Sequence, residues 1–168
     1  MRKSEGSSGV ELCECLNPRR NKYVVRWDIH PKKDEDGREI KGNVEFMEQE
    51  FNHKPTLSEV KELVTSWYNS IIDEKILSGF RFNDIPVWLS SENQFNYKAA
   101  YDIAVQKHGA NLPIKFKLGT DEEPVYVTFS TVEELEAFYL QSVYYIQNTL
   151  NEGWEMKNNI NWEAYGLV

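Results

Sequence analysis

Apolar residues along this chain change three times from a spacing of two to a spacing of three and four. Alternation at a spacing of two is typical of half-buried strands, and steps of three and four are typical of amphipathic helices. Each change follows two strand-like segments joined by turn residues, which predicts three successive β-hairpin–helix units. This order favours an α+β fold with antiparallel strands and about three main helices, not the single alternating strands of a parallel sheet.

The first of these units is predicted over residues 23–78. Tyr23–His30 alternates apolar and polar residues, and Asn43–Phe51 returns as a second strand. Thr56 then stands three positions before Glu59, the spacing of a capping box, in which each side chain satisfies a free backbone N–H near the other. The apolar steps that follow predict a helix through the rest of the unit.

The second unit combines a short hairpin with a helix. Two three-residue strands are expected around the turn Asn83-Asp84, because Asn and Asp tolerate turn conformations. Ser90 or Ser91 is expected to cap a helix that runs to His108. The face of this helix that we expect to point inward holds Phe95, Ala99, Ile103 and Tyr101.

The third unit repeats the pattern at greater length. Pro113–Leu118 and Val125–Phe129 alternate as a full hairpin, and a second capping box at Thr131 starts the longest helix. Glycine is a frequent helix terminator, so Gly153 is expected to end this helix. Residues 154–168 then form a short closing segment.

Residues 1–22 show no hydrophobic period and are rich in Ser, Gly and charged residues. They are expected to form a flexible N-terminal arm that adds nothing to the core. The remaining residues, 23–168, are expected to form a single α+β domain, divided into a first hairpin and helix at 23–78 and a second part at 79–168.

Charge is unevenly distributed along the chain. Residues 1–33 hold eight Lys and Arg against four Asp and Glu, a net +4, whereas residues 34–168 hold eleven against twenty-three, a net −12. A body this acidic repels a phosphate backbone, which makes nucleic acid an unlikely partner. Arg19 and Arg20 are the candidates for contact with an anionic partner, and a solvated leader is the simpler interpretation.

The N-terminal segment, the lack of a long apolar run and the two cysteines predict a protein that folds in a reducing cytoplasm. No apolar segment follows Arg2 and Lys3 as in a secretory signal, and no run approaches the ~18 apolar residues of a membrane span. Cys13 and Cys15 are too few for a disulfide framework. Their spacing does not match paired zinc ligands either, so reduced thiols and no metal are expected.

Catalytic motifs are not recognisable in the sequence. There is no Gly-x-Ser-x-Gly elbow and no phosphate-binding glycine loop, and neither cysteine has a neighbouring His. The acidic clusters 121–123 and 133–136 fit a hairpin loop and the first turn of a helix, where negative charge is stabilising. We therefore predict no catalytic residue, no cofactor and no enzymatic activity.

Aromatic residues make up 13% of the chain and are the stronger signal. Trp88 and Tyr97 flank the short hairpin and Trp154 and Trp162 lie near the C-terminus, where they could anchor a protein interface or stack on sugars. The alternative is that they complete a small core. These four, with Arg19 and Arg20, are the candidate interaction residues.

Over roughly residues 75–160 the chain also resembles a small domain of unknown function encoded near tail genes in phages and prophages, including those of gut Bacteroidetes. The segments that carry the resemblance are Lys75–Phe82, Val87–Ser90, Gln94–Asn96, Leu112-Pro113, Val132–Leu135 and Gly153-Trp154-x-x-Lys157. The family has no catalytic residues to transfer. The resemblance implies a virion-associated or tail-assembly protein whose partners are other phage proteins.

These observations favour a non-enzymatic phage or prophage structural or tail-assembly accessory protein. It would act through protein–protein contacts, with a homo-oligomer as one form, in the host cytoplasm during assembly or in the virion. Two alternatives stay open: a glycan-binding module that uses exposed aromatics, and an acidic inhibitor of a host nucleic-acid-binding protein. A small hydrolase is the weakest interpretation.

Overall fold

The structure is a computed structural model and describes residues 1–167. Helices and antiparallel sheets give the predicted α+β fold. The chain divides into two compact units: the first is Met1–Trp67 together with the segment from Asn159 onward, and the second is Tyr68–Asn158. This division differs from the single domain expected over residues 23–168.

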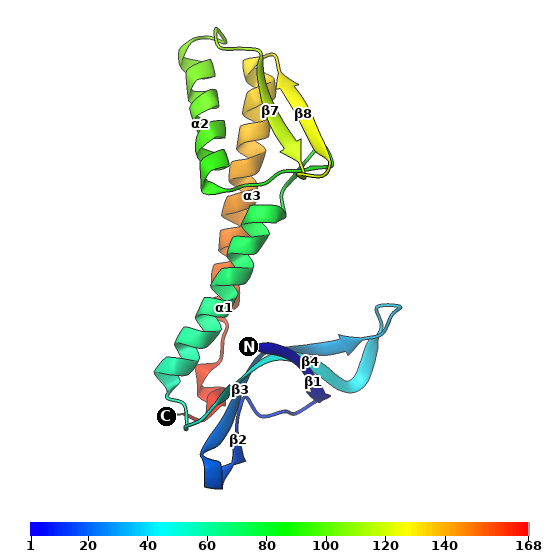
Figure 1. Ribbon diagram of the computed structural model, residues 1–168, viewed down its shortest axis with the longest axis vertical. Helices are drawn as coiled ribbons and strands as arrows, with labels where there is room; N and C mark the ends of the chain where they lie inside the picture. The colour runs from blue at the N-terminus through cyan, green and yellow to red at the C-terminus, as the bar shows by residue number, and fades with distance from the viewer. Residues whose placement is uncertain (168) are drawn as a thin grey trace. The chain divides into compact units, whose positions relative to one another are not determined.

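The first unit is built on a four-stranded antiparallel sheet in the order β1-β4-β3-β2 (Figure 1). Its elements are β1 (Arg2–Ser7), β2 (Cys13–Asn17), the 3-10 helix η1 (Pro18–Arg20), β3 (Lys22–Lys33) and β4 (Glu39–Phe51). The hairpin predicted between residues 23 and 51 is the β3–β4 pair.

The prediction of a flexible arm at residues 1–22 is wrong, because this segment supplies both edge strands of the sheet. β1 pairs with β4 from Arg2 opposite Glu48 to Ser7 opposite Asn43. Edge strands are commonly charged and have little apolar surface. Ion pairs hold β1 to the sheet, from Arg2 and Lys3 to β4 and from Glu5 to Lys32 of β3, and these charged residues stand where an apolar period would otherwise be.

One face of this sheet is apolar. Val25 and Trp27 are buried, and the Trp27 ring packs edge-on against Trp67 of helix α1 (Leu57–Ser78), with 6.1 Å between ring centroids. The expected alternation stops after Trp27, where a register shift coincides with a positive φ of 55° at Asp28. Ile29, one of the apolar positions of that alternation, is exposed for this reason.

The opposite face contains a buried carboxylate. Glu48 accepts hydrogen bonds from Arg2 Nε at 2.7 Å and Ser4 Oγ at 2.8 Å, and Arg26 Nε lies 3.5 Å from its second oxygen. Burial raises the pKa of Glu48, but the hydrogen bonds from Ser4 and Arg2 outweigh it, and the net pKa is lowered. Sequence alone gave no sign that this residue is buried.

The capping box of α1 forms as predicted. The Glu59 N–H donates to Thr56 Oγ1 at 3.3 Å, and the Thr56 N–H donates to Glu59 Oε2 at 2.7 Å. The backbone and side-chain hydrogen bonds from Thr56, with one from His53, lower the pKa of Glu59 to about 2.

The second unit has an aromatic core. Its elements are β5 (Arg81–Phe82), β6 (Ile85–Pro86), α2 (Ser91–Gln106), β7 (Ile114–Gly119), β8 (Pro124–Phe129) and α3 (Val132–Asn158), with the C-terminal part of α1. α2, α3 and the β7–β8 hairpin pack around one shared core (Figure 1), and α2 also contacts the hairpin directly through Tyr97 and Phe116. Phe138 of α3 is fully buried and packs against Tyr97 of α2, Phe116 of β7 and Phe129 of β8.

Two sequence predictions in the second unit are confirmed and one is wrong. The short hairpin turns at Asn83-Asp84, and the Ser90 hydroxyl caps α2 by accepting from the Asn93 N–H at 3.2 Å. The buried face of α2, however, consists of Tyr97, Ala100 and Ala104. The predicted inward residues Phe95 and Ile103 are 71% and 47% exposed.

Helix α3 does not end at Gly153 but continues to Asn158. Gly153 is buried, and a Cβ at this position would overlap the side chain of Ile72 on α1. Its lack of a side chain therefore serves packing rather than helix termination. A 3-10 helix, η2 (Trp162–Tyr165), follows in the first unit.

Candidate interaction site

The six candidate interaction residues do not come together in one site. Arg19, Arg20 and Trp162 lie in the first unit, and Trp88, Tyr97 and Trp154 lie in the second. Both arginines are exposed in η1.

Two of the candidate aromatics are occupied by contacts within the fold. Tyr97 is buried, with its ring centroid 4.8 Å from that of Phe116, and an interaction role does not fit this position. Trp162 is half-buried, stacks on Tyr165 and has the Lys61 ammonium 5.7 Å from its ring centroid. Trp88 and Trp154 remain as the exposed candidates of the second unit.

Trp88 is exposed because its neighbours are anchored in the core. Val87 and Leu89 are both buried, and in an extended segment the residue between them points the other way. Backbone hydrogen bonds tie both neighbours down: the Val87 N–H donates to the Phe80 carbonyl and the Leu89 N–H to the Leu77 carbonyl, each at 2.9 Å. The indole is therefore held outward by a rigid backbone.

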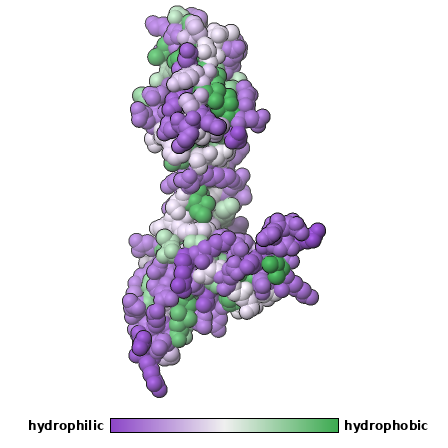
Figure 2. All heavy atoms as spheres, turned by 45° about the vertical axis from the view of Figure 1, so that its right-hand side comes forward, coloured by the Kyte–Doolittle hydropathy of each residue, from purple (hydrophilic) through white to green (hydrophobic). Residues whose placement is uncertain are grey.

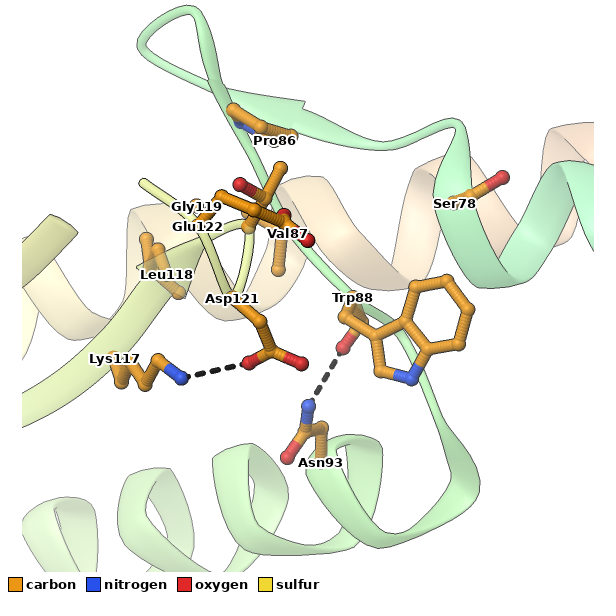
Figure 3. Close-up of a pocket in the computed structure, with 11 residues that line it drawn as sticks. Ser78, Pro86, Val87, Trp88, Asn93, Lys117, Leu118, Gly119, Asp121 and Glu122 are labelled. Atoms are coloured by element: carbon orange, nitrogen blue, oxygen red, sulfur yellow. Dashed lines mark hydrogen bonds and ion pairs between the residues drawn. The ribbon is translucent and has the colours of Figure 1, made fainter. Parts of the chain in front are cut away.

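A hollow of about 550 Å³ lies beside Trp88 (Figure 3). The β7–β8 hairpin tip forms its opposite wall, with the Asp121 carboxylate and the Asn93 amide near the indole in the close-up. This volume is in the range of about 300–1,000 Å³ typical of small-molecule sites. The lining of the hollow includes Trp88, Asn93, Lys117, Asp121 and Glu122.

Polar groups at this hollow make hydrogen bonds with one another, and the Asp121 side chain is 94% exposed. Asn93 Nδ2 donates to the Trp88 carbonyl at 2.8 Å, which leaves the Asn93 Oδ1 atom as an acceptor. Lys117 Nζ donates to Asp121 Oδ1 at 2.8 Å. That hydrogen bond and the lysine charge lower the pKa of Asp121, so the carboxylate is ionised throughout the neutral range. No sequence signal joins these residues, because Trp88 and Asn93 lie at and just before the start of α2 and Lys117 and Asp121 belong to the β7–β8 hairpin.

A second exposed feature is the outward face of α2. We define this α2 outward face by Phe95, Ala99 and Ile103, which lie four residues apart, with Lys98 and Asp102 on one flank. Lys98 and Asp102 form an ion pair at 2.6 Å. Figure 2 shows hydrophobic residues at the surface in patches among hydrophilic ones.

Within residues 1–167 the structure has no group of three or more His, Cys, Asp or Glu side chains placed to hold a metal ion. Cys13 and Cys15 are free thiols on β2, and burial raises the pKa of Cys13. No helix in the same range is both long enough and apolar enough to cross a bilayer.

No family model matches the chain, and no curated protein or solved structure is significantly similar to it.

Proposed function

We propose that the chain is a non-catalytic protein that works through protein–protein contacts. Following the sequence resemblance, we place it among the structural or tail-assembly accessory proteins of a phage or prophage, acting in the host cytoplasm during assembly. The observation that supports the contact role is the α2 outward face, where Phe95 is 71% exposed on a rigid helix. A large aromatic held in this way is a typical interface anchor.

The partner that fits this face best is a second copy of the chain. Ala99 lies at the centre of the face, with Phe95 four residues before it and Ile103 four residues after it. If two copies of α2 pack antiparallel about a two-fold axis at Ala99, Phe95 of each copy lies level with the partner's Ile103. The small side chain of Ala99 lets the two helices approach closely at the axis.

In this arrangement the flanks of the two copies lie on the same side, and each flank carries one base and one acid. Lys98 precedes Ala99 by one residue and Asp102 follows it by three, so antiparallel packing places Lys98 two residues along the axis, about 3 Å, from both the partner's Asp102 and the partner's Lys98. The 16 residues of α2 span only about 24 Å, so we expect a weak, reversible dimer.

Charge-reversal variants test this arrangement. Lys98→Asp gives a helix with two acids on the flank, and Asp102→Lys gives one with two bases. Each variant alone should be monomeric near 19.7 kDa by sedimentation velocity, whereas an equimolar mixture should form a heterodimer of twice that mass.

Phe95→Ser should also give a monomer, and Tyr144→Ser, a similarly exposed residue on α3, should leave the dimer intact. A wild-type protein that stays monomeric at high concentration, or a mixture that does not associate, would contradict the proposal.

The phage setting needs a separate test. Tail-assembly intermediates and mature virions of the phage that encodes the protein should contain it, as judged by mass spectrometry of purified particles. Its absence from both would remove the assembly role without bearing on the dimer.

A further inference from the structure

We propose that the hollow beside Trp88 binds a neutral saccharide. Several hydrogen bonds hold the backbone around Trp88 in place, and its indole lies half-exposed at the edge of the unit. Val87, Leu89 and Asn93 fix the backbone on both sides of Trp88, while the indole itself remains 50% exposed. An aromatic ring held in advance binds a ligand with a smaller entropic cost than a mobile one.

A flat aromatic surface beside polar groups matches the chemistry of a sugar ring. One face of a pyranose presents C–H groups that stack on an aromatic ring, and its edge presents hydroxyls that both donate and accept. The hollow offers both kinds of partner (Figure 3): the Trp88 indole, and the acceptors Asn93 Oδ1 and Asp121 Oδ2 with the donor Lys117 Nζ.

Charge at the hollow selects against an acidic ligand. Lys117 is already paired with Asp121, and Glu122 adds a second carboxylate to the lining. The hairpin tip is therefore net negative, which repels a sialic acid, a uronic acid or a phosphate. Neutral hexoses and N-acetylhexosamines carry hydroxyl and amide groups that these side chains can satisfy.

The backbone of the hairpin tip gives the site a defined wall. Gly119 has a φ of +83°, and a Cβ there would overlap the Glu123 carbonyl, so the turn requires glycine. The Glu123 N–H donates to Thr120 Oγ1 at 3.0 Å, which closes the turn. Lys117 and Asp121 are thus positioned by the β7–β8 hairpin, and Trp88 and Asn93 by the start of α2.

Binding can be measured on the full chain with a panel of neutral trisaccharides: maltotriose, cellotriose and triacetylchitotriose. Saturation-transfer NMR and tryptophan fluorescence should detect at least one of them. Trp88→Ala should weaken binding of that probe about tenfold or more, since a central aromatic anchor is lost. Trp88→Tyr should retain part of the affinity, and Asp121→Asn should weaken it less than Trp88→Ala.

The matched control is Trp154→Ala, because Trp154 is 49% exposed in the same unit but does not line the hollow. This variant should bind within about twofold of wild type, and a thermal melt should show that both alanine variants are folded.

Three results would overturn the proposal: no probe binds, Trp88→Ala binds as well as wild type, or 3′-sialyllactose binds better than the neutral probes. A Trp88→Ala protein that loses dimer mass while no probe binds would assign the hollow to a protein contact instead. The dimer and the saccharide site can therefore fail independently.

Discussion

Gly153 illustrates how the surroundings of one residue decide its role. Glycine ends many helices because it adopts a left-handed conformation without strain, and that property made it the expected end of α3. Here the backbone stays helical, and the space of a side chain is taken by Ile72. The same holds for Phe95, which has the size and chemistry of a core residue but lies on the outer face of α2.

The contact between Gly153 and Ile72 predicts that the effect of Gly153→Ala on the free energy of unfolding changes sign with the residue at position 72. Gly153→Ala alone should destabilise the protein by about 1 kcal/mol, because overpacking outweighs the gain in helix propensity. In an Ile72→Ala background the same substitution should be stabilising, since the new methyl fills vacated space and the propensity gain remains. Urea unfolding of the four proteins measures both effects, and a stabilising Gly153→Ala in the wild-type background would contradict this packing.

Helix starts are the elements that local sequence specifies best in this chain. At α1 the side chains of Thr56 and Glu59 satisfy each other's backbone N–H groups within four residues. At α3 the Glu134 N–H donates to Thr131 Oγ1, but Glu134 reaches back to the N–H of Ser130 rather than that of Thr131. Both caps depend on neighbours in sequence, which is why they were predictable.

The cap of α1 should impose a pH dependence on stability. The pKa of Glu59 is about 2 in the folded protein and ordinarily 4.5, so its stabilising contribution is present above pH 4.5 and is lost as the pH falls towards 2. Glu59→Gln should flatten this part of the profile of thermal midpoint against pH. Glu62→Gln, one turn further along, should leave it unchanged. Equal slopes in wild type and Glu59→Gln would show that the cap does not form in solution.

At the scale of the whole molecule, the chain forms two compact units that each have buried residues of their own. The first has a sheet with Trp27 on one face and the Glu48 network on the other, and the second has the aromatic cluster around Phe138. Units with separate cores commonly open with separate free energies. We expect the same here.

Glu48→Gln tests this independence. The substitution removes a buried charge that pairs with Arg2 and Arg26, so it should destabilise the first unit by about 2–3 kcal/mol. Hydrogen exchange should accelerate about 30-fold or more in β3 and β4 and stay nearly unchanged in β7, β8 and α3. Glu50→Gln, on the same strand but more exposed, is the control and should have little effect. Equal acceleration in both units would indicate a single cooperative fold.

Local sequence determined the class of fold, the hairpins and the helix starts, because alternation, turn residues and caps act between residues a few positions apart. Tertiary structure alone decided that residues 1–22 belong to a sheet, that Gly153 packs against Ile72, and which face of α2 is buried. It also brought Trp88 and Asp121 to one hollow from a helix start and a hairpin tip. Those outcomes depend on which distant segments supply hydrogen bonds and fill space, and no local pattern of apolar residues records them.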